Sequence, residues 1–273
     1  MKNKGILLVT LAVLIFTGCT LQPGDEDFDF YRNGNDTYIA DAKTWPKTKY
    51  AIRYTYYGYC NGAFLSPVLI LTAAHCLEGK AQPNPGSKIT IEYYSSSGER
   101  KTTVVSFKNY AIAPALGDYF YKGSKSRDVA VMFLAGIDKP NDLPILTLIN
   151  PKKLDSIPIG GSVAIHSIHD VSYGDDYQYT TRKAPYSPPA SSYGADYPLG
   201  HNFFTEVRPN ARHGDSGGVY IAYFRTSYFD NGVSRVEPYA LATLSVADIS
   251  TRTSIYYRWL EDQRIIAAFS WKS

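Results

Sequence analysis

Hydrophobic residues along this chain fall in short runs separated by polar, turn-forming segments. Lys88–Tyr94 and Lys101–Phe107 alternate between apolar and polar side chains, which is the period of a half-buried strand. Ser95–Glu99 lies between these two runs and is typical of a hairpin loop. Further short strands are predicted over Tyr50–Tyr56, Gly62–Ser66, Val68–Leu71, Ser162–Ile168, Phe203–Val207, Val219–Phe224 and Tyr239–Val246. Many short strands with frequent turns predict an all-β sandwich or barrel.

The C-terminal segment has a different period. Over Tyr257–Phe269 the apolar residues recur at roughly helical spacing, which predicts a C-terminal α-helix. Its expected apolar face consists of Leu260, Ile266 and Phe269, with Trp259 and Ile265 beside them. No other segment has the length and period of an interior helix.

The N-terminus has the pattern of a targeting segment. A basic start, Met1–Lys4, precedes an apolar run, Ile6–Phe16, that is too short to span a bilayer as a stable helix. Small residues then precede Cys19, which resembles a bacterial lipoprotein signal. We therefore expect residues 1–18 to be a signal peptide, Cys19 to carry lipid, and residues 19–37 to be a polar tether. The alternative is an ordinary secretory signal with an incidental cysteine.

The expected location follows from this segment. It is the bacterial cell envelope, with the protein lipid-anchored at the outer membrane, in the periplasm or at the cell surface, or else secreted. Charged residues make up 19% of the 273 residues and the net charge is +3, which is too balanced to indicate nucleic acid as a partner. The 24 tyrosines favour strands and agree with an all-β fold.

Three segments carry candidate chemistry. A glycine-rich turn, Arg212-His213-Gly214-Asp215-Ser216-Gly217-Gly218, exposes one serine hydroxyl and lets a substrate approach its backbone closely. Upstream, His75 follows a predicted strand, and Asp128 opens an apolar strand between His75 and the turn. A base, a carboxylate and a nucleophile thus occur in the chain order His, Asp, Ser.

These segments resemble the trypsin/chymotrypsin-like serine proteases, from about Trp45 to the C-terminus. The resemblance implies two six-stranded antiparallel β-barrels with a C-terminal α-helix, and an active site in the cleft between the barrels. Residues 38–140 would form the first barrel with His75 and Asp128, and residues 141–273 the second barrel with Ser216 and the helix. Pro140–Pro144 is the candidate linker.

The resemblance also implies a role for each residue. His75 would act as general base for the nucleophile Ser216, and Asp128 would orient His75. The backbone N–H groups of Gly214 and Ser216 would form the oxyanion hole. No cofactor is expected.

The substrate pocket implied by the resemblance is formed by Asn210, Ser245 and Ala247. Trypsin-like enzymes have Asp at the position of Asn210, so a strong preference for Lys or Arg is not indicated. Asp248 could supply a charge instead.

The cysteines fit an exported protein. If Cys19 carries lipid, Cys60 and Cys76 remain and can pair, as in the disulfide that ties the histidine loop to its neighbouring strand in the resembled family. In that family Asp215 pairs with an α-amino group that activation cleavage releases. The matching segment after Tyr38 is a poor match, so both the activation step and the partner of Asp215 stay open.

His166 and His169 superficially resemble metal ligands. Three residues apart on a strand, they would face opposite sides, so we expect exposed polar residues and no metal site.

The sequence as a whole predicts a monomeric serine endopeptidase acting on a protein or peptide. The alternatives are a non-catalytic binding protein of the same fold and an esterase with the same triad.

Overall fold

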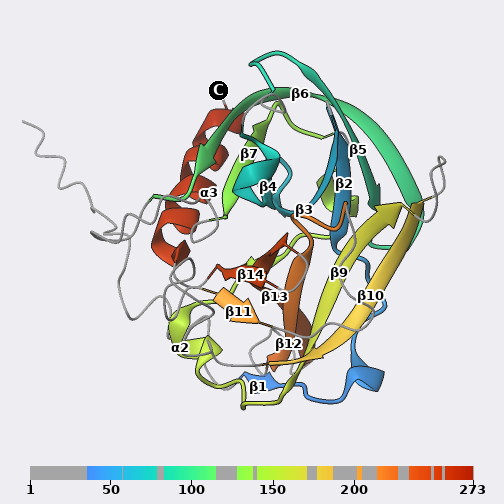
Figure 1. Cartoon of the computed structure of the whole chain (residues 1–273), viewed down its shortest axis with the longest axis vertical. Helices are drawn as coiled ribbons and strands as arrows, with labels where there is room; N and C mark the ends of the chain where they lie inside the picture. Colours follow the sequence, from blue (N-terminus) through green and yellow to red (C-terminus); the bar gives the residue numbers. More distant parts are fainter. Residues whose placement is uncertain are drawn as a thin grey trace, which may run out of the picture. The chain divides into compact units, whose positions relative to one another are not determined.

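The computed structural model describes residues 36–56, 58–78, 83–114, 128–137, 140–170, 177–186, 202–204, 214–226, 234–246, 249–253 and 256–272. Six strands form a closed antiparallel barrel in the order β2-β3-β4-β7-β6-β5 (Figure 1). They are β2 (Ala51–Thr55), β3 (Tyr59–Ser66), β4 (Leu69–Thr72), β5 (Lys88–Tyr94), β6 (Arg100–Ile112) and β7 (Ala130–Leu134). Alternation in β5 turns Ile89, Ile91 and Tyr93 into the barrel core.

The second half of the chain, together with β1, forms another sheet of eight described strands, where a second barrel was predicted. The described strands follow the path β10-β9-β12-β13-β14-β11, and β1 pairs with β12 while β8 pairs in parallel with β13. Their bounds are β1 (Thr37–Tyr38), β8 (Thr147–Leu148), β9 (Ser162–Asp170), β10 (Tyr177–Pro185), β11 (Asn202–Phe204), β12 (Val219–Thr226), β13 (Arg235–Val246) and β14 (Ile249–Arg252).

Helical structure is sparse in the described residues. It comprises the 3-10 helices η1 (Ala42–Thr44), η2 (Ala74–Cys76) and η5 (Pro140–Asp142), with α2 (Pro151–Leu154) and the C-terminal α3 (Tyr257–Lys272). The helix α3 contacts β7 and β8. The all-β class, a six-stranded barrel and the C-terminal helix are thereby confirmed. No helix in the described part of the chain is both long enough and apolar enough to cross a membrane.

The predicted apolar face of α3 is wrong in part. Leu260 and Ala267 are buried, whereas Ile266 is 50% and Phe269 75% exposed. Leu260 and Ala267 are seven residues apart, so they lie on one face two turns apart, and that face is the one against the body of the protein.

The N-terminal boundary of the folded body also differs from the prediction. Thr37 and Tyr38 pair with Arg225 and Phe224 of β12, so β1 belongs to the second sheet and not to the first barrel. Asp36, expected in the tether, is buried in an ion pair with Lys153. The predicted tether therefore ends before Asp36 and not at residue 37. The segment from residue 38 joins the second sheet and not the first barrel.

Candidate active site

His75 is held at the mouth of the barrel by a short helix and a disulfide. β4 ends at Thr72, and η2 then places His75 with its side chain 37% exposed. The next residue, Cys76, is bonded to Cys60 of β3 with a Cα–Cα distance of 6.2 Å. The predicted disulfide is therefore present, and it ties the histidine segment to a neighbouring strand.

Asp128 lies just before β7 and its buried carboxylate faces His75. Oδ1 accepts the backbone N–H of His75 at 2.8 Å, and Oδ2 lies 2.7 Å from His75 Nδ1. A carboxylate only accepts, so Nδ1 carries the proton and Nε2 is left as the basic nitrogen. The hydroxyl of Ser245 also donates to Oδ2, and Thr243 Oγ1 donates to the Asp128 carbonyl at 3.1 Å.

This environment changes the pKa of His75. Burial lowers it, but the hydrogen bond to Asp128 and the negative charges of Asp128 and Glu78 raise it by more. The net pKa lies above the ordinary value of 6.5. His75 is therefore a stronger base than a free imidazole.

The turn at residues 214–218 requires its glycines. Gly214 and Gly217 have φ values of 94° and 81°, which side-chain-bearing residues rarely adopt. A Cβ on Gly217 would also lie 2.0 Å from the carbonyl oxygen of Asn61. Two hydrogen bonds with Leu244 of β13 hold the turn, from Gly217 N–H at 2.8 Å and to the Gly218 carbonyl at 2.7 Å.

Hydrogen bonds connect the turn of Ser216 to the segments that hold His75 and Asp128 from two sides. The Ser216 carbonyl accepts the N–H of Asn61 at 2.7 Å, and Asn61 follows the cysteine that is bonded to Cys76. On the other side, Leu244 binds the turn while the next residue, Ser245, binds Asp128. No hydrogen bond joins the Ser216 hydroxyl to His75, and both residues lie in the described part of the chain.

Asp215 has an internal partner that the sequence did not indicate. Its side chain is 1% exposed, and Oδ2 accepts a hydrogen bond from Arg182 Nη2 of β10 at 2.6 Å. His169 Nδ1 lies 3.7 Å from the other oxygen. Sequence reasoning missed Arg182 because β10 lay in no predicted strand. Thr181, Arg182 and Lys183 are all polar, so the sequence holds no alternation that marks Arg182 as the buried one of the three.

Part of the predicted pocket lies outside the described residues, namely Asn210, Ala247 and the nearby Asp248, as does the predicted lipid site Cys19. The predicted pocket residue Ser245 is described, and its side chain is directed to Asp128. The hydroxyl of Ser245 therefore holds the carboxylate of Asp128. That Ser245 also lines the substrate pocket stays a prediction.

The two histidines of β9 do face opposite sides, but both are buried, so the expectation of exposed residues is wrong. His166 Nδ1 accepts from the Tyr50 N–H and contacts Tyr179, and Nε2 lies 3.3 Å from the Tyr223 hydroxyl. Burial lowers the pKa of His166 to about 3, which keeps it neutral. Another group, Cys60, His75 and Cys76, has ligand atoms within 4.8 Å of one another, but the disulfide consumes both thiols.

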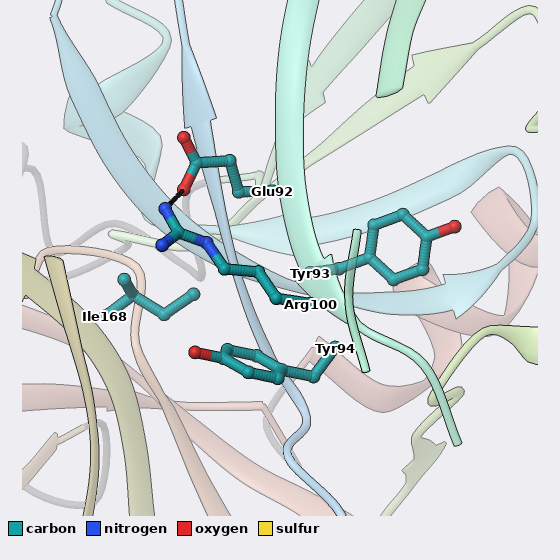
Figure 2. A pocket seen from close by; sticks show the side chains of 5 residues that line it. All are labelled: Glu92, Tyr93, Tyr94, Arg100 and Ile168. Atoms are coloured by element: carbon teal, nitrogen blue, oxygen red, sulfur yellow. Dashed lines mark hydrogen bonds and ion pairs between the residues drawn. The ribbon is translucent and has the colours of Figure 1, made fainter. Parts of the chain in front are cut away.

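A small hollow lies beside the β5–β6 hairpin rather than at Ser216. It is lined by Glu92, Tyr93, Tyr94, Arg100 and Ile168, and an ion pair of 2.9 Å joins Arg100 to Glu92 across it (Figure 2). Its lining holds no serine, cysteine or histidine, so the candidate site stays at His75, Asp128 and Ser216.

Comparison with known proteins agrees with this arrangement. No curated protein matches the sequence. The family model described as Trypsin matches residues 40–260, which is well over half of the chain and includes His75, Asp128 and Ser216. The chain therefore belongs to the trypsin family, whose fold is that of the trypsin-like serine proteases.

Proposed function

We propose that the protein is an exported serine endopeptidase that hydrolyses peptide bonds through Ser216, His75 and Asp128. The observation that carries this proposal is the buried carboxylate of Asp128, hydrogen-bonded to both the backbone N–H and Nδ1 of His75. This pairing leaves Nε2 as the basic nitrogen of His75, which is what a general base for a serine nucleophile requires.

The first half of the reaction forms an acyl-enzyme. Ser216 Oγ attacks the substrate carbonyl carbon while its proton passes to His75 Nε2, and the carbonyl π electrons move to the oxygen. The N–H groups of Gly214 and Ser216 bind that oxyanion. When the C–N bond breaks, the leaving amine takes the proton from His75, and Asp128 stabilises the imidazolium throughout.

The second half releases the acid. Water gives a proton to His75 Nε2 and its oxygen attacks the acyl carbon. The bond to Ser216 Oγ then breaks, and the serine recovers its proton from His75. No cofactor takes part in either half.

Location and specificity belong to the same proposal. The N-terminal pattern supports export and lipid attachment at Cys19, so the monomeric enzyme would act at the cell envelope. The family resemblance assigns Asn210 to the base of the substrate pocket, and an uncharged residue there supports a preference other than Lys or Arg for the residue before the scissile bond.

The test is covalent labelling of the purified chain with a fluorophosphonate, read by intact mass and peptide mapping. We expect a single adduct on Ser216, lost in Ser216→Ala and kept in the matched control Ser97→Ala, a serine of the β5–β6 hairpin turn. Cleavage of labelled casein would establish the endopeptidase. Hydrolysis of p-nitrophenyl acetate without casein cleavage would indicate an esterase, and no adduct under any condition would leave a binding protein.

A further inference from the structure

The turn at residues 214–218 is held by buried groups of the uncleaved chain. Within this turn, Asp215 lies between Gly214 and Ser216, the two residues whose N–H groups would bind the oxyanion. Its own carbonyl accepts the Gly218 N–H at 2.9 Å. The peptide is planar and trans, so fixing this carbonyl also fixes the direction of the Ser216 N–H.

Arg182 binds the side chain of Asp215 from β10. Nη2 donates to Asp215 Oδ2 at 2.6 Å and to Ser167 Oγ at 2.7 Å, and the Arg182 side chain is only 8% exposed. Ser167 is fully buried on the adjacent strand β9. The guanidinium is therefore fixed by β9 and β10 and supplies a permanent positive charge at Asp215.

Asn61 binds the same turn from the barrel. Nδ2 donates to the Gly214 carbonyl and, at 2.9 Å, to the Ile168 carbonyl, while Oδ1 accepts the Ile168 N–H at 2.7 Å. The backbone N–H of Asn61 binds the Ser216 carbonyl. Asn61 is completely buried. One side chain thus links the barrel, β9 and the turn.

The segment that would supply a new α-amino group is bound elsewhere. The Ile39 N–H donates to the Tyr223 carbonyl at 2.9 Å, and Tyr38 before it, in β1, is paired with Phe224 of β12. Tyr223 is four residues along β12 from Val219, which is ~13 Å at the rise of a strand. Val219 directly follows the turn, so Ile39 is anchored well away from Asp215.

We propose that Arg182 and Asn61 are positioning residues that hold residues 214–218 in the catalytic shape, so the uncleaved chain is active without cleavage after Tyr38. This rests on the proposed function. Arg182 provides the cation at Asp215, and Asn61 fixes the neighbouring Gly214 carbonyl.

The first arm of the test compares intact and cleaved protein. The rate of fluorophosphonate labelling of Ser216 is measured on the intact chain, with the N-terminus read by intact mass, and again after limited proteolysis. Equal rates support the proposal. A rate that rises only when Ile39 becomes the N-terminus overturns it. No labelling of either form would remove the proposed function itself and, with it, the basis of the inference.

The second arm uses variants of the intact chain. Arg182→Met should slow the labelling of Ser216 by about 10²–10³-fold, which is the loss of rate expected when one oxyanion donor is removed. It should also lower kcat for p-nitrophenyl acetate with little change in KM. Arg182→Lys should recover part of the rate, because it keeps the charge. Lys183→Met, an exposed neighbour on the same strand, should match the wild type.

A folded Arg182→Met with the wild-type labelling rate would overturn the role of Arg182. Folding is checked by circular dichroism and Tm. If Arg182→Met does not fold, Asn61→Ala and the intact-chain arm decide the question. Asn61→Ala should lower kcat more than it raises KM, and an unchanged kcat in a folded Asn61→Ala contradicts the proposal.

Discussion

Asp128 determines what His75 can do chemically at the scale of single residues. Burial lowers the pKa of His75, but the hydrogen bond and negative charge of Asp128, together with the charge of Glu78, raise it by more. The same carboxylate selects the tautomer in which Nε2 is basic. Ser245 and Thr243 of β13 hold Asp128 in turn, so the base is set by groups from both halves of the chain.

Replacing the carboxylate tests this dependence. Asp128→Asn removes the charge that raises the pKa of His75, so the midpoint of the pH–rate profile for fluorophosphonate labelling should move to lower pH. The maximal rate should fall by about 10⁴-fold, because the amide no longer selects the reactive tautomer.

Ser245→Ala is the matched control for this change. Ser245→Ala removes one hydrogen-bond donor to Asp128 but keeps the negative charge of Asp128 and both of its contacts with His75. The midpoint of the pH–rate profile of Ser245→Ala should therefore stay above that of Asp128→Asn. Equal midpoints in Asp128→Asn and the wild type would show that Asp128 does not set the pKa of His75.

The elements are joined by a few buried polar contacts. β1 is only two residues long, yet Asp36 before it forms an ion pair with Lys153 of α2. Lys153 Nζ also donates to the Tyr239 hydroxyl at 2.9 Å and lies 4.0 Å from the centre of that ring. Side-chain exposure is 3% for Lys153 and 2% for Asp36, so the pair is shielded from water.

Removing the cation should leave Asp36 as an uncompensated buried charge. We expect Lys153→Met to lower the free energy of unfolding by about 3–5 kcal/mol in urea titrations. The exposed neighbour Lys152 provides the control, and Lys152→Met should change the free energy of unfolding by less than about 0.5 kcal/mol. Adding Asp36→Asn to the Lys153→Met variant should restore part of the lost stability. A stable Lys153→Met would mean that this pair does not anchor β1.

The whole molecule depends on contacts between the barrel and the second sheet. His166 is one of these contacts, because it accepts the N–H of Tyr50, just before β2, and lies beside Tyr179 and Tyr223 of the second sheet. Asn61 is another, since it joins β3 to β9. The candidate site requires both halves, and such contacts hold the halves together.

The lowered pKa of His166 predicts a pH dependence of global stability. Between pH 6.5 and about 3 the unfolded chain binds a proton at His166 that the folded protein excludes. The stabilisation is therefore complete above pH 6.5 and is lost as the pH falls, by about 1.4 kcal/mol per pH unit within that window.

Urea titrations at pH 7, 6, 5 and 4 measure this slope. His166→Gln keeps hydrogen-bonding groups but cannot titrate, so its free energy of unfolding should fall less steeply over this range. Parallel curves for the variant and the wild type would exclude His166 as the cause.

Several features followed from local patterns. Lys88–Tyr94 was predicted from alternation and is β5 with the same bounds, because period-two burial is written into consecutive residues. The segments around His75, Asp128 and Ser216 likewise depend on short-range chemistry, and a cysteine pair sixteen residues apart matched a known loop. The all-β class, the family and the disulfide could therefore be predicted.

Other features depended on pairings between distant residues. Asn61 and Gly214 are 153 positions apart, and Arg182 and Asp215 come together only through the register of β10 on β9. Neither an asparagine after a cysteine nor an arginine in a polar strand indicates its partner, because the partner is set by strand order. Periodicity thus sufficed for the fold class, and the motifs around His75, Asp128 and Ser216 with their family resemblance sufficed for the candidate triad. The packing of the two sheets determined which buried groups hold the turn around Ser216.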